Sequence, residues 1–115
     1  MLILLDTHAL LWFLSDSPRL PDHIRDLLLR QDSQLFFSSV SVLEIAIKHS
    51  LKPEAMPCAA DAVHADAVAS GIVESPFLSR HAQEVGNLPS KLRSAHKALA
   101  ARIEPKVYEY GFLKR

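Results

Sequence analysis

Apolar and polar positions follow two periods along most of the chain. Residues 2–5 (LILL) are a continuous apolar run, which is typical of a strand buried on both faces of a parallel sheet. Residues 35–39 (LFFSS) and 72–75 (IVES) are predicted as two further strands. Segments with apolar residues three and four positions apart, the spacing of one helix face, separate and follow these runs. Strands that alternate with helices predict an α/β fold with a central parallel sheet.

Five helices are expected between and after these strands within residues 1–89. They begin near Thr7 and Pro21, and span residues 41–51, 58–70 and 79–85. Gly71 stands where a residue with left-handed backbone would end the fourth helix. The length of 115 residues fits one domain.

Composition and the N-terminus narrow the class of protein. Hydrophobic residues make up 49% and charged residues 23% of the chain, as in ordinary globular proteins. Cys58 is the only cysteine, so an intramolecular disulfide and a cysteine-based zinc site are excluded. The apolar start lacks a preceding Lys or Arg and is interrupted by Asp6 and His8, so we expect neither secretion nor membrane insertion, but a cytoplasmic protein.

The charge is balanced overall but unevenly distributed. Residues 1–89 hold 6 Lys and Arg against 11 Asp and Glu, a balance of −5, whereas residues 90–115 hold 7 against 2, a balance of +5. A basic tail of this kind contacts nucleic acid in some proteins, and in others it docks on the acidic body or is simply solvated. Both interpretations stay open at this stage.

Asp6 is the first candidate for chemistry, because it directly follows the first predicted strand. Ligands of parallel sheets bind at the carboxyl ends of the strands. A buried carboxylate without a partner costs several kcal/mol, roughly, so a cation or water is expected beside it. Asp6 is equally suited to cap the following helix.

Three other kinds of site with an aspartate after a strand are excluded by its neighbours. Haloacid-dehalogenase phosphatases need a second Asp two residues later, and integrin-type metal sites need Ser two and four residues later. This chain has His8 and Leu10 at those positions. Receiver domains need further acids that this chain lacks.

Glu44 is the second candidate. It lies in the helix after the second strand, and it faces the same crevice as Asp6 if the two strands are neighbours. Two close carboxylates repel unless a hard divalent cation lies between them. Two structural interpretations compete: Ser41 and Glu44 match a capping box, and Glu44 and Lys48 match a helical ion pair.

The segments LLDTHALLWFLSDSPRL and SSVSVLEIAIKHSL resemble the PIN-domain family, most closely the toxin subunits of bacterial type II toxin–antitoxin pairs. The resemblance runs from residue 2 to about Pro89. It implies a three-layer α/β domain that acts as a Mg²⁺- or Mn²⁺-dependent ribonuclease, forms dimers and is silenced by a cognate antitoxin. It also implies that Asp6 and Glu44 are catalytic, metal-ligating acids, and that the Thr7 hydroxyl beside them contacts the substrate.

The chain departs from this family after Leu88 and Pro89. A His-Arg-Asp-Pro-Phe-Asp-Arg-like stretch with the third acid is expected there, but no Asp occurs after Asp66 and the only later acids are Glu104 and Glu109. We therefore divide the chain into a PIN-like body, 1–89, and a divergent basic tail, 90–115, produced by truncation, frameshift or remodelling. Loss of the third acid predicts weak metal binding and little or no RNA cleavage.

The tail and the assembly carry their own predictions. We expect a helix at about 91–103, and a strand within 106–113 (KVYEYGFL) that covers the open edge of the first strand. We also expect a homodimer or higher oligomer. The alternative function is a non-catalytic truncated or frameshifted PIN protein that retains an antitoxin-binding or dimerisation surface.

Overall fold

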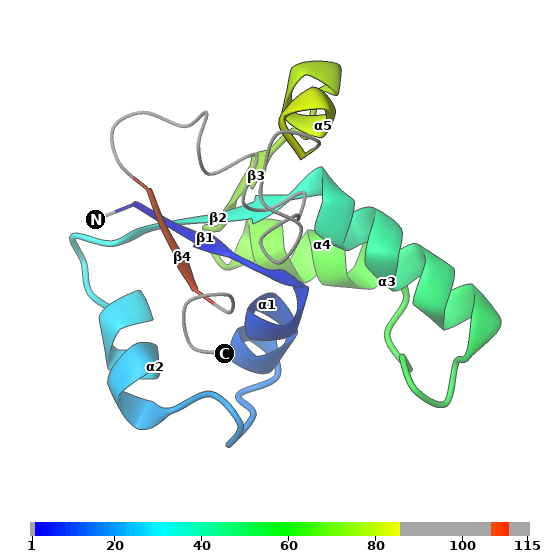
Figure 1. Ribbon diagram of the computed structural model, residues 1–115. Coiled ribbons are helices and arrows are strands. Elements are labelled where there is room, and N and C mark those ends of the chain that lie inside the picture. Colours follow the sequence, from blue (N-terminus) through cyan, green and yellow to red (C-terminus); the bar gives the residue numbers. More distant parts are fainter. Residues whose placement is uncertain (1, 86–106, 111–115) are drawn as a thin grey trace.

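The structure, a computed structural model, describes residues 2–85 and 107–110 (Figure 1). The predicted α/β architecture is confirmed. The elements, in chain order, are β1 (Leu2–Leu5), α1 (Thr7–Leu14), α2 (Asp22–Leu28), β2 (Gln34–Ser38), α3 (Ser39–Leu51), α4 (Ala60–Ala69), β3 (Val73–Ser75), α5 (Ser79–Val85) and β4 (Val107–Tyr110).

The sheet has four parallel strands in the order β3-β2-β1-β4. β1 pairs with β2 from Leu2 opposite Gln34 to Leu5 opposite Phe37. β2 and β3 lie on one side of β1, and β4 lies on the other. The direction in which successive strands are added to the sheet therefore reverses at β1. A reversal of this kind opens a crevice at the carboxyl end of the central strand, where α/β proteins bind ligands.

β4 is the edge strand beside β1, and it comes from the second half of the sequence. Its four residues pair with β1 from Leu2 opposite Val107 to Leu5 opposite Tyr110, within the same chain. The expectation that 106–113 would cover this edge is therefore confirmed for 107–110. The helix predicted at 91–103 lies outside the described residues.

The core lies against the sheet and between the helices. α1, α3 and α4 contact one another, and Figure 1 shows α3 and α4 side by side. Among the described residues, no helix is long and apolar enough to cross a membrane. The buried apolar residues are Ile3, Leu4, Leu5, Ala9, Leu10, Leu20, Ile24, Leu28, Leu35, Phe37, Ile45, Met56, Val63, Ala67 and Ile72.

α4 ends in the way its glycine predicts. Gly71 has a positive φ of 82°. The amide of Gly71 donates to the Val68 carbonyl and the amide of Ile72 to the Ala67 carbonyl, both at 3.0 Å. This pair of bonds is a Schellman motif, and the buried Ile72 and Ala67 side chains close it.

Candidate functional site

Asp6 joins the end of β1 to the start of α1. One carboxylate oxygen, Oδ1, accepts the Ala9 amide hydrogen at 2.9 Å, so Asp6 is the N-cap of α1 and the predicted capping role is confirmed. The residue is 4% exposed. The cap fixes the carboxylate at the carboxyl end of β1, the strand at which the strand order reverses.

Thr7 connects α1 to α3. Its side chain is buried, and its hydroxyl lies within donating distance of two side chains of α3: Ser41 Oγ at 3.0 Å and Glu44 Oε2 at 3.2 Å. Because Thr7 follows Asp6 directly, these bonds bring the Glu44 carboxylate to the end of β1 that carries Asp6. The condition set by the sequence, that the first two strands be neighbours, is met.

Neither structural interpretation of Glu44 is correct. The capping box fails because α3 begins at Ser39 rather than at 41, and its N-cap is Ser38, whose Oγ accepts the Val40 amide hydrogen at 3.0 Å. The helical ion pair also fails: within the described part of the chain, no carboxylate oxygen lies within 4.0 Å of the Lys48 ammonium.

Ser41 is a member of the site that the sequence analysis named only as a possible helix cap. Its side chain is fully buried on α3, where it meets the Thr7 hydroxyl. A serine in the midst of an apolar helix face was the available signal, since buried hydroxyls need a hydrogen-bonding partner. The neighbouring Ser39 has a separate structural role, because its Oγ accepts the Phe77 amide hydrogen at 2.8 Å.

The donor set consists of hard oxygens from Asp6, Glu44 and the hydroxyl beside them. Among the side chains that the structure describes, those of residues 2–83, no three His, Cys, Asp or Glu gather in a way that could hold a metal ion. In the backbone register Glu109 of β4 lies opposite Leu4, two residues short of the level of Asp6. Within the described side chains, the candidate site therefore holds two carboxylates.

Comparison with known proteins gives the family. A family model described as "PIN domain" matches residues 3–103, which carries the match beyond Pro89, where the resemblance in the sequence stopped. No curated protein matches the chain.

One solved structure with a similar fold is the crystal structure of VapBC2 from Rickettsia felis bound to a DNA fragment from their promoter. It is 18% identical, with a TM-score of 0.52, over 86% of this chain and 76% of that chain. At 18% identity, this similarity shows a shared fold and nothing more. Together with the family match over most of the chain's length, the fold leads to one conclusion: the chain belongs to the PIN domain family.

Proposed function

We propose that the chain is the toxin-type member of a toxin–antitoxin pair and that Asp6 and Glu44 form a weak, single-cation site for RNA hydrolysis. The observation that carries this proposal is the 3.2 Å hydrogen bond from Thr7 to Glu44. It holds an acid of α3 at the strand end that bears Asp6, although Thr7 and Glu44 are 37 positions apart in the sequence.

The residues fit a hard cation. Mg²⁺ is commonly bound through one or two carboxylates, with waters and substrate phosphates as the other ligands. When bound, such a cation polarises a phosphate oxygen and lowers the pKa of an attacking water. Asp6 is oriented by the cap to Ala9, and Glu44 by the Thr7 hydroxyl, so both acids are held in place without the cation.

The same geometry supports low activity. Two carboxylates bring less charge and fewer anchoring directions than a cluster, and hard-cation affinity follows ligand charge. A reacting group misplaced by about 1 Å loses a factor of ~100 in rate. We therefore expect weak Mg²⁺ or Mn²⁺ binding and little or no RNA cleavage.

The partners follow from the same proposal. The fold neighbour is a VapBC2 complex on its promoter DNA, and by analogy we propose a cognate antitoxin as the protein partner of this chain.

The free, exposed Cys58 suits the reducing cytoplasm, where we place the protein. The division into a 1–89 body and a 90–115 tail stays a prediction.

A stripe on α3 supports a homodimer. Leu43, Ile47 and Leu51 stand four residues apart and are 58%, 49% and 74% exposed. Residues at this spacing share one helix face. A two-fold pairing would bury the stripe against its own copy.

The test is cleavage of a mixed RNA pool in Mn²⁺. The native chain, Asp6→Asn, Glu44→Gln and a control, Glu54→Gln on an exposed turn, are compared. We expect slow cutting at most, retained by the control and lost in both site variants. Cutting that survives both site variants removes Asp6 and Glu44 from the mechanism. Robust cutting that both variants abolish refutes the weak-site part of the proposal.

A second candidate is the non-catalytic derivative, favoured by the lack of a three-acid group among the described residues. It predicts no cutting and no Mn²⁺ binding, with the dimer intact. Mn²⁺ binding that depends on Asp6 and Glu44 would exclude it.

A further inference from the structure

A pocket is lined by residues that lie within one helical turn of each of the two acids. It lies between α1, α3 and the segment that leads into α4, and its volume is about 440 Å³. This is within the range of ~300–1,000 Å³ that is usual for small-ligand sites. His8, next to Thr7, lines it from α1, and Lys48, one turn after Glu44, lines it from α3. A turn of helix is about 5.4 Å, so the pocket adjoins the acids.

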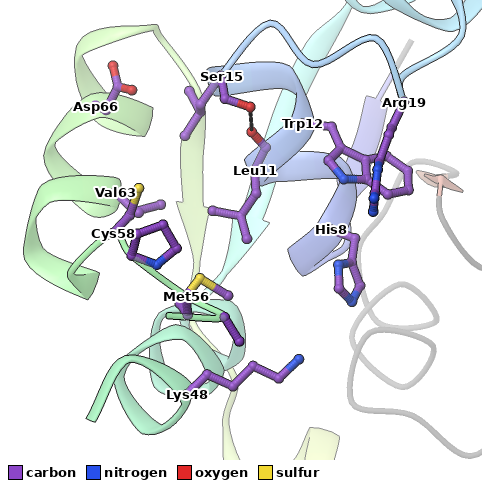
Figure 2. A pocket seen from close by; sticks show the side chains of 13 residues that line it. His8, Leu11, Trp12, Ser15, Arg19, Lys48, Met56, Cys58, Val63 and Asp66 are labelled. Carbon is purple, nitrogen blue, oxygen red and sulfur yellow. Dashed lines mark hydrogen bonds between the residues drawn. The ribbon is translucent and has the colours of Figure 1, made fainter. Parts of the chain in front are cut away.

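Two rings form one wall. His8 and Trp12 are one turn apart on α1, with ring centroids 6.0 Å apart and planes tilted by 40° (Figure 2). His8 is exposed and Trp12 half-buried, so ring surface remains open to the pocket. Aromatic side chains placed in this way stack unpaired bases of single-stranded nucleic acids.

Two cations stand beside the rings. Arg19 comes from the loop after α1 and Lys48 from α3, and both are exposed. Among the side chains of residues 2–83, no carboxylate oxygen lies within 4.0 Å of either cation. Asp66 on α4 is the one acid that lines the pocket in the described chain, and Figure 2 shows it on the far side from Arg19. The ring side of the pocket therefore combines positive charge with aromatic surface.

We propose that this pocket is a base-binding subsite for single-stranded RNA, in which Trp12 and His8 stack one base while Arg19 and Lys48 bind the flanking phosphates. The inference rests on the proposed function, since it concerns the strand whose phosphate would lie at Asp6 and Glu44. Apolar residues such as Met56 also line the pocket, so a protein side chain is the competing occupant. The positive charge, which has no carboxylate partner among the side chains of residues 2–83, favours RNA over that occupant.

The test measures binding without cleavage. Trp12 is the only tryptophan, so its fluorescence reports on the pocket directly. The full chain is titrated in EDTA with a short oligouridylate and with an abasic strand of the same length, and affinity is measured by anisotropy of a labelled strand. We expect quenching of Trp12 and tight binding with the oligouridylate, and weaker binding without quenching for the abasic strand.

Matched variants separate stacking from charge and from folding. Trp12→Leu keeps apolar packing but removes the ring face, and should raise the Kd about 5- to 140-fold, the equivalent of ~1–3 kcal/mol. Trp12→Phe should restore most of the affinity. Lys48→Ala should lower the salt dependence by about 0.7 in log–log slope, whereas Lys52→Ala, an exposed lysine outside the pocket, should change neither Kd nor slope. Thermal melting confirms that each variant is folded.

The outcomes separate this proposal from the proposed function. Equal binding of the oligouridylate and the abasic strand, or an unchanged Kd in folded Trp12→Leu, overturns the base-binding subsite and leaves a protein partner as occupant. Because no metal is present, loss of metal binding or cleavage in Asp6→Asn and Glu44→Gln has no bearing on this result. RNA binding that depends on Trp12 supports the subsite even if the acids prove inactive.

Discussion

Asp6 has two roles in this account, helix cap and metal ligand, and two substitutions separate them. Asn retains a side-chain oxygen that caps a helix about as well as Asp, whereas Ala has none. Both substitutions remove the negative charge. The stability difference between Asp6→Asn and Asp6→Ala therefore isolates the hydrogen bond to the Ala9 amide, 2.9 Å in the structure.

The size of this difference follows from the burial of the cap. Replacing an N-cap by Ala costs about 0.5–2 kcal/mol. Ala9 is 1% exposed, so water cannot replace the lost acceptor at its amide hydrogen. The upper half of that range, about 1–2 kcal/mol, therefore applies. For a domain near this size the gap in melting temperature is roughly 4–8 °C. The charge at the helix N-terminus, worth ~0.3–1 kcal/mol, is lost equally in both variants.

Thermal unfolding in EDTA, followed by far-UV circular dichroism, measures the gap. We expect Asp6→Asn to melt near the native chain and Asp6→Ala clearly below Asp6→Asn. If the two variants melt at the same temperature, the cap seen in the structure contributes nothing and the argument from Ala9 is wrong.

Three other variants test separate parts of the structure. Thr7→Val should cost about 1–2 kcal/mol in unfolding free energy and weaken Mn²⁺ binding, because the hydroxyl that positions Glu44 is lost. Denaturant unfolding measures the first effect and Mn²⁺ titration the second, and an unchanged Mn²⁺ affinity would refute the positioning role. Gly71→Ala should cost about 1–2 kcal/mol in a denaturant melt, since the φ of 82° strains a residue with Cβ; an unchanged melt would refute the strain. Leu43→Glu with Ile47→Glu should convert a dimer to a monomer in light scattering, and a dimer that persists would exclude the α3 stripe as its interface.

The helices and strands could be predicted accurately where the spacing of apolar residues and the helix-ending residues agreed. The helix predicted at 79–85 is α5, with the same bounds, and Gly71 ends the α4 region as expected. α4 itself begins at Ala60 rather than at 58. The starts of helices were harder, because SSVS at 38–41 offers three hydroxyls as caps. The structure uses Ser38, the last residue of β2, so strand and helix join without a linker.

The candidate site was predictable in its acids but not in its connections. Asp6 could be recognised because it interrupts an apolar run. Which side chain would meet Glu44 depended on the order of strands, which periodicity does not encode. The contact between Thr7 and α3 follows only once β1 and β2 are neighbours. For this reason the sequence favoured the local interpretations of Glu44, a cap or a pair with Lys48, and the structure shows neither.

A titration of Mn²⁺ binding by electron paramagnetic resonance, in which free Mn²⁺ is counted directly, tests the central claim most closely. We expect one Mn²⁺ per chain for the native protein and for Glu54→Gln, with a Kd of about 10⁻⁴–10⁻³ M. We expect loss of that site in Asp6→Asn and in Glu44→Gln, both folded by circular dichroism. Native-like Mn²⁺ binding in either folded site variant would contradict the claim that these two carboxylates together form the metal site.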